Sequence, residues 1–154
     1  MKDGKGLVKE FNLYNGKLSY DGEYLNGQKN GKGKQYGFDG RLQYEGEFLN
    51  VKKNGKGKEY NFKGQLGYKG QYLNGKKHGK GKEFNYEGEL EFEGEYLYDF
   101  FLKGKYYIKE KLEFEGEYRY NKKWNGKGYD ENGNLIYVFI NGNEKKVLKN
   151  YIAI

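Results

Sequence analysis

Leu18-Ser-Tyr-Asp-Gly-Glu-Tyr24 returns almost unchanged as Leu42-Gln-Tyr-Glu-Gly-Glu-Phe48 and as Leu66-Gly-Tyr-Lys-Gly-Gln-Tyr72. The three stretches begin 24 residues apart, and further copies begin at Leu90 and Leu112. A fixed period of this length is typical of a stack of similar small units rather than of a globule built around one catalytic pocket. The period therefore predicts an array, and such arrays usually bind other molecules.

Apolar and polar side chains alternate along each copy, with Leu18 and Tyr20 on one side and Ser19 on the other. A period of two is typical of a β-strand, because successive side chains point to opposite faces of a sheet. The next half of each unit carries a Gly-Lys-Gly-Lys signature and ends at a turn dipeptide such as Asp39-Gly40. Each unit is therefore predicted to be a β-hairpin, with successive hairpins paired edge to edge.

Each copy also places a glycine between two aromatic residues on the same strand face. An aromatic ring can lie flat over a strand that has no side chain at that point. Aromatic residues make up 19% of the chain, so we expect the rings to hold neighbouring strands together, each cross-strand pair contributing about 0.2–1 kcal/mol. The glycines concerned are Gly22, Gly46, Gly70, Gly94 and Gly116.

The pattern Tyr20-Asp-Gly-Glu-Tyr-Leu-Asn-Gly27, followed by Lys29-Asn-Gly-Lys-Gly-Lys34, resembles the membrane occupation and recognition nexus (MORN) repeat. The resemblance extends from about Gly4 to Gly133, and several tandem copies carry it. It implies an all-β fold, an elongated, twisted, single-layer antiparallel sheet of tandem β-hairpin repeats. It also implies a role in protein–protein contacts, dimerisation or phospholipid association.

The chain departs from the family pattern in two ways. The fourth unit reads Leu97-Tyr-Asp-Phe-Phe-Leu102-Lys-Gly104 and lacks the lysine-glycine signature, which removes the basis for a loop-borne function there. A smaller ring also replaces the tryptophan that is usual in the first strand of the repeat. The smaller rings are Tyr24, Phe48, Tyr72, Tyr96 and Tyr118.

Residues 1–134 are predicted to form the array, with a partial first repeat and a degenerate fourth. Residues 135–154 break the pattern, since Ile136-Tyr-Val-Phe-Ile140 is a continuous apolar run that is followed by an Asn141-Gly142 turn and a second apolar stretch. An array needs a different terminal unit to close its end, so we expect a capping β-hairpin or extension here. A dimer contact or a junction to a further domain is the alternative.

Lysine and arginine outnumber aspartate and glutamate by 29 to 22, which gives a net charge of +7. If every repeat returns its loop to the same side, the loop lysines form a basic stripe along one long edge of the sheet. Such an edge suits an anionic phospholipid surface or an acidic protein, and it equally suits a solvated rim that discourages aggregation. The glutamates from Glu87 to Glu95 alternate with other residues, which predicts an acidic strand face. The lysines concerned are Lys29, Lys32, Lys52, Lys53, Lys56, Lys76, Lys77 and Lys80.

The aromatic rows are the other candidate binding surface, because a one-layer sheet cannot cover both of its own faces. A large exposed apolar patch marks an interaction site, so the rows are interpreted as a surface for a protein partner or for a second copy in a homodimer. The alternative is that the rings only hold the sheet together. The residues concerned are Tyr20, Tyr24, Tyr44, Phe48, Tyr68, Tyr72, Phe92, Tyr96, Phe114 and Tyr118.

Catalytic constellations are nearly absent, so we expect a binding scaffold that is not an enzyme and uses no metal or cofactor. His78 replaces the Asn30 and Asn54 of other copies, which indicates a repeat variant rather than a general base. No helix is predicted after Gly31-Lys-Gly33 to bind phosphate, and the acidic face disfavours nucleic acid. Without cysteine or a secretory leader, the chain is expected in the cytoplasm, either free or at a membrane surface.

Overall fold

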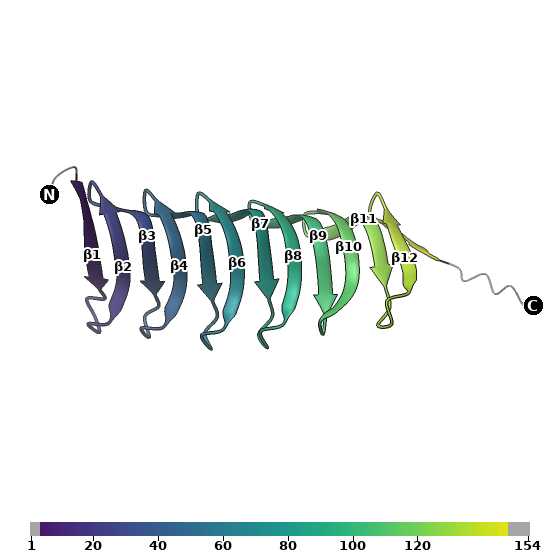
Figure 1. Cartoon of the computed structure of the whole chain (residues 1–154), viewed down its shortest axis with the longest axis horizontal. Coiled ribbons are helices and arrows are strands. Elements are labelled where there is room, and N and C mark those ends of the chain that lie inside the picture. Colours follow the sequence, from purple (N-terminus) through teal and green to yellow (C-terminus); the bar gives the residue numbers. More distant parts are fainter. Residues whose placement is uncertain (1–3, 148–154) are drawn as a thin grey trace, which may run out of the picture.

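The computed structural model of the chain describes residues 4–147, and these form thirteen β-strands in one open antiparallel sheet (Figure 1). The strands follow one another across the sheet in sequence order, so each strand pairs only with its neighbours along the chain. The sheet is elongated, and its strands run across the long axis. No α-helix occurs among the described residues, and the all-β, single-layer prediction is confirmed. The strands are β1 (Lys5–Phe11), β2 (Leu18–Leu25), β3 (Gln28–Tyr36), β4 (Leu42–Leu49), β5 (Lys52–Tyr60), β6 (Leu66–Leu73), β7 (Lys76–Phe84), β8 (Leu90–Leu97), β9 (Phe100–Ile108), β10 (Lys111–Arg119), β11 (Lys122–Tyr129), β12 (Leu135–Ile140) and β13 (Asn143–Lys146).

Two kinds of turn alternate along the array and lie on opposite long edges of the sheet (Figure 1). At the tight-turn edge, two-residue turns such as Asn26-Gly27 have both residues at positive φ, 50° and 79°, as in the type I′ turns that suit twisted hairpins. At the loop edge, five-residue loops such as 61–65 are closed by the Asn61 side chain, whose Oδ1 accepts the Lys63 backbone N–H. Asp39-Gly40 lies in such a loop and not in a tight turn, and only its glycine has a positive φ.

The period shortens after the fourth unit because one loop becomes a tight turn. β9 and β10 are joined by two residues, Lys109-Glu110, both at positive φ. This turn replaces the five-residue loop of the earlier units, so the copy at Leu112 begins only 22 residues after the copy at Leu90. The fourth unit nevertheless keeps its own hairpin, with Tyr98-Asp99 as the tight turn between β8 and β9.

The core is a row of aromatic rings on one face of the sheet, which we call the aromatic face. The Tyr44 ring lies over Gly46 and Gly57, which pair across adjacent strands, and its hydroxyl donates to the Glu47 carbonyl at 3.0 Å. Neighbouring rings meet edge to face, with 5.4 Å between the centroids of Tyr44 and Tyr72. Such pairs contribute about 0.5–1.5 kcal/mol beyond the area they bury. The prediction that rings lie over glycines is confirmed.

The last described strands form a hairpin that covers one end of this row. β12 and β13 are joined at Asn141-Gly142, with φ of 51° and 77°. Tyr137 and Phe139 pack against the core, and the Phe139 centroid lies 5.9 Å from that of Phe114. These contacts place the hairpin at the end of the aromatic row. The predicted second apolar stretch begins at Val147, whose backbone N–H donates to the Ile136 carbonyl at 2.9 Å, and its remaining residues, 148–154, lie outside the described residues.

Replacing Gly46 by valine tests the close approach of backbone and ring at the aromatic face. A Cβ at this position would lie 2.6 Å from the Gly57 Cα and 2.5 Å from the Tyr44 hydroxyl oxygen, so the strand pair has to separate. We expect the free energy of unfolding to fall by about 3 kcal/mol. The measurement is urea-induced unfolding followed by circular dichroism.

Gly75→Val is the matched control, since a Cβ there would have no atom within 4 Å. The equivalent residue of the preceding unit is already Val51, at a φ of 72°. Only left-handed backbone strain is expected from this change, about 1–2 kcal/mol. Equal losses in the two variants would contradict a core built from rings over glycines.

Candidate functional site

The aromatic residues predicted to bind a partner are buried. Nine of the ten have at most 7% of their surface exposed, and the tenth, Tyr24, is partly buried against the same core. The expectation of an exposed aromatic surface is therefore wrong. A partner approaching this face would meet the side chains that cover the rings. The nine buried residues are Tyr20, Tyr44, Phe48, Tyr68, Tyr72, Phe92, Tyr96, Phe114 and Tyr118.

Lysine side chains cover the rings on the aromatic face. The Lys53 Nζ lies 4.7 Å from the centroid of the Tyr44 ring and is ion-paired with Glu59. Lys29 and Lys77 cover rings in the same way, each paired with a glutamate. A cation–π contact contributes about 0.5–1 kcal/mol at exposed sites and more where water is excluded, while the lysine stem adds apolar cover. These three lysines were expected on a basic edge, and they cover the core instead.

Phe101 takes the place of this lysine in the fourth unit. Its ring stacks on Phe92 with the centroids 3.9 Å apart and the planes at 12°. The position opposite Phe92 on β9, which is a glutamate in the two preceding units, is Tyr106, whose hydroxyl donates to Glu91 at 2.9 Å. Because a phenyl ring needs no counter-ion, the unit without the lysine-glycine signature keeps a covered core by another contact.

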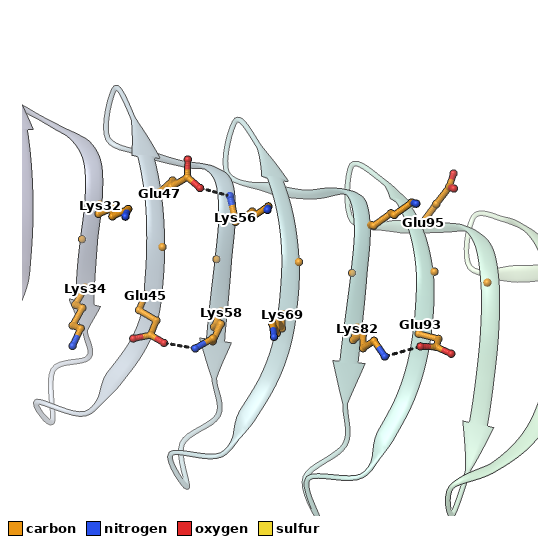
Figure 2. A pocket seen from close by; sticks show the side chains of 18 of the residues that line it. Lys32, Lys34, Glu45, Glu47, Lys56, Lys58, Lys69, Lys82, Glu93 and Glu95 are labelled. Atoms are coloured by element: carbon orange, nitrogen blue, oxygen red, sulfur yellow. Dashed lines mark hydrogen bonds and ion pairs between the residues drawn. The ribbon is translucent and has the colours of Figure 1, made fainter.

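The opposite face of the sheet holds an open trough of about 1350 Å³ that crosses strands β1 to β9. Figure 2 shows a row of charged side chains on either side of its floor, with Lys32 in one row and Lys34 in the other. The floor is formed by the glycines over which the rings of the other face lie, so both faces depend on a single row of residues. The glycines are Gly33, Gly46, Gly57, Gly70, Gly81, Gly94 and Gly104.

The lysines expected on one basic edge are divided among three places. Lys32, Lys56 and Lys80 line the trough, whereas Lys52 and Lys76 are the first residues of their strands at the tight-turn edge. The remaining three cover the aromatic face. The segment predicted to be a loop, 52–58, belongs to strand β5, and successive side chains of a strand point to opposite faces. The predicted single basic stripe is therefore wrong.

Charge in the trough alternates from strand to strand. β4 presents Glu45 and Glu47, whereas β5 presents Lys56 and Lys58 (Figure 2). The same alternation holds between β2 and β3 and between β8 and β9. The glutamates from Glu87 to Glu95 had predicted an acidic face. The face instead carries both signs of charge. Opposite charges on adjacent strands contribute about 0.2–1 kcal/mol per pair to the stability of a sheet.

Ordered hydrogen bonds join the acidic and basic strands of the trough. The Lys58 Nζ lies 2.8 Å from Glu45, and the Tyr60 hydroxyl donates to the same carboxylate at 2.7 Å. The hydrogen bond from Lys58, together with that from Tyr60, lowers the pKa of Glu45. Burial and the bond to this carboxylate raise the pKa of Tyr60 to about 12. Glu93 has the same two kinds of donor, although they come from two strands, Lys82 from β7 and Tyr107 from β9, and they lower its pKa in the same way.

Sequence reasoning missed a row of exposed aromatic residues at the loop edge. They are 62–93% exposed, and their recurrence every 24 residues is the signal that could have revealed them. Adjacent loops are tied together, since the Asn15 Nδ2 donates to the Phe38 carbonyl at 2.7 Å. The rings of Phe62 and Tyr86 lie 5.9 Å apart. The four residues are Tyr14, Phe38, Phe62 and Tyr86.

The described part of the chain offers few side chains for metal binding or acid–base chemistry. Within residues 4–147, no three His, Asp or Glu side chains are placed to hold a metal ion. His78 lies in β7 and not in a loop, and its ring packs 4.9 Å from that of Tyr98. None of the chain between residues 4 and 147 forms a helix with the length and apolar character needed to cross a bilayer.

The chain was compared with protein-family models and with curated proteins. No family model matches the chain, and no curated protein matches it significantly.

The Glu45–Lys58 pair predicts a specific pH dependence. A carboxylate whose pKa is lowered by folding contributes stability above its unfolded pKa, and that contribution is lost as the pH falls through the lower, folded pKa. Lys58→Met should therefore lower the free energy of unfolding at neutral pH by under about 1 kcal/mol, and the difference should vanish in acid.

Chemical denaturation over a pH series, together with an NMR titration of the Glu45 carboxyl group, is the measurement. Lys52→Met serves as the control, because Lys52 is exposed at the tight-turn edge. A pH-independent loss in Lys58→Met, or an unchanged Glu45 titration, would show that the pair has no electrostatic role.

Proposed function

We propose that this chain is a MORN-type repeat scaffold, without enzymatic activity, that binds a segment of a partner protein in the trough. The observation that carries this proposal is the trough itself, an open channel of about 1350 Å³ lined by charged residues. Its charged side chains lie on the face opposite the aromatic core. A ligand can therefore contact them without disturbing the contacts that hold the sheet together.

The mixed charge of the trough supports a protein segment as the ligand. Carboxylates and ammonium groups lie on alternate strands, which are spaced about 4.8 Å apart. A peptide with side chains of both signs finds partners along its length. A uniform polyanion such as nucleic acid would be repelled wherever a strand presents glutamates such as Glu45 and Glu47. Complementarity of this kind gives specificity and fast association more than affinity.

A second candidate function, attachment to a phospholipid surface, is favoured by the loop edge. Aromatic side chains are enriched at the interface of a bilayer, and four of them are exposed in a row there. Lys17, Arg41 and Lys63 lie in the same loops. Near an anionic surface, each basic residue adds about 1 kcal/mol of attraction.

Site-specific photo-cross-linking tests the trough proposal. A benzophenone amino acid is placed at Lys32 or Lys103 in the trough, and at Lys52 on the tight-turn edge as the control. In cells that produce the chain, we expect discrete protein adducts from both trough positions and few from the control. Mass spectrometry of the adducts should find one partner segment at both trough positions. Equal labelling at all three positions would contradict the proposal.

Vesicle co-sedimentation tests the second candidate. Binding to phosphatidylserine vesicles should fall at least about tenfold in Phe62→Ser/Tyr86→Ser, because both exposed rings are lost from the loop edge. Lys52→Gln/Lys76→Gln, which changes the opposite edge, should bind as the unmodified protein does. Loss of binding in the lysine variant alone would assign lipid attachment to the tight-turn edge instead.

A further inference from the structure

The alternation of charge along the trough is broken at one strand. On β6, Lys69 and Gln71 occupy the positions that hold Glu45 and Glu47 on β4. β6 contains no acidic residue. Three successive strands therefore face the trough with lysines and with no carboxylate between them. The lysines of this central patch are Lys56, Lys58, Lys69, Lys80 and Lys82.

At the Gln71 position, the structure keeps the hydrogen bond that the lost acid would have accepted. The Gln71 Oε1 accepts the backbone N–H of Lys80 at 2.9 Å, as the Glu47 Oε1 accepts that of Lys56 at 3.1 Å. The amide thus keeps the hydrogen bond of the glutamate and removes its charge. Phe84 is the equivalent of Tyr60, so the hydroxyl that would need the missing carboxylate is also gone. The three differences in this unit, Lys69, Gln71 and Phe84, keep the strand in place and leave the positive charge of the patch without a carboxylate on β6.

The central patch has unfavourable electrostatics in the isolated chain. Lys69 is directly opposite Lys58 on one side and Lys82 on the other, and like charges in such positions destabilise a sheet. Lys58 and Lys82 each have a glutamate on their outer side, Glu45 and Glu93 (Figure 2). Among the described residues Lys69 has no ion-pair partner, and its side chain is exposed. An anion bound over β6 would relieve this repulsion.

We propose that the centre of the trough binds a short acidic stretch of a partner peptide, flanked on both sides by basic residues; this rests on the proposed function of the trough. The patch spans β5 to β7, two strand spacings or about 10 Å. An extended chain covers that distance in about three residues. Beyond the patch, β4 and β8 present glutamates, so the residues that flank the acidic stretch meet negative charge.

These flanking glutamates select a peptide over a longer polyanion. A nucleic acid strand, a polyphosphate or an anionic bilayer presents negative charge over far more than about 10 Å. It would meet Glu45 and Glu47 on one side of the patch, and Glu93 and Glu95 on the other. A peptide can reverse its charge within one or two residues, since neighbouring side chains are independent. Only such a ligand matches the order of charges along the trough.

The probe is a synthetic peptide, Lys-Lys-Glu-Glu-Glu-Lys-Lys, compared with the inverse peptide Glu-Glu-Lys-Lys-Lys-Glu-Glu. The chain has a net charge of +7, so non-specific attraction favours the inverse peptide, which is net negative, whereas the trough favours the first. Titrations are followed by NMR at the amide signals of Gly57, Gly70 and Gly81 on the trough floor. We expect the first peptide to bind more tightly and to shift these signals. Tighter binding of the inverse peptide at them would overturn the proposal.

The variant Lys69→Glu/Gln71→Glu/Phe84→Tyr restores the pattern of the neighbouring units, and its new tyrosine hydroxyl can donate to the carboxylate introduced on β6, as in the Glu45–Tyr60 pair. It should fold at least as stably as the unmodified chain and bind the first peptide at least about tenfold more weakly. Lys63→Glu/Gln28→Glu is the matched control, because it exchanges the same residue types for glutamate at exposed positions away from the trough floor. Undiminished binding by the restored variant, or equal loss in the control, would overturn the proposal.

Two further results separate this inference from the proposed function. If the trough position Lys32 cross-links a partner equally well in the restored variant and the unmodified chain, the acidic stretch is refuted while the trough remains the binding surface. If no partner cross-links there, the proposed function fails as well. A single-stranded oligonucleotide or phosphatidylserine vesicle that displaces the first peptide from the Gly70 signal at lower concentration would assign the patch to a polyanion.

Discussion

A sheet of one layer has no second layer to bury its apolar side chains, so each ring must find cover on its own face. In this chain glycine makes this possible, because it leaves room for a ring directly against the backbone. The ring of Tyr44 can lie flat because Gly46 and Gly57 present no side chain beneath it, and the next ring can then meet it edge to face. Lys53 completes the cover from above. Strand pairing, the aromatic row and the trough floor all depend on this contact between ring and glycine.

The two faces consequently have different roles. One face holds the rings, the lysines over them and the glutamates that balance those lysines. The other holds side chains that contribute cross-strand ion pairs and hydrogen bonds at the surface, and exposed ion pairs are individually weak. The separation follows from the period of two along each strand, since every second residue belongs to the core and the others belong to the trough. Binding and folding therefore use different residues of the same strands.

Much of the fold could be predicted from the sequence because its determinants are local. Alternation predicted the strands, and the glycine between two aromatics predicted the ring contact that Tyr44 makes. The site could not be predicted in the same way. The lysine-glycine segment 52–58 resembles a loop in composition, but the turn is made by Asn50-Val51, which leaves that segment to β5. Whether Lys53 covers a ring or faces solvent depends on the register between strands, which composition does not reveal.

The separation of the faces also bears on how such a chain can diversify. Each strand pairs only with its sequence neighbours, and its trough positions carry no ring or glycine of the core. Two residues per strand can therefore be exchanged with little change to the backbone, provided that hydrogen bonds such as the one that the Gln71 side chain accepts are kept. The order of charges along the trough can thus vary while the fold stays the same. Lys69 and Gln71, with Phe84 as their compensating change, are one example of such a variation. Arrays with identical rings and glycines would recognise different ligands if the order of charged side chains along the trough differed.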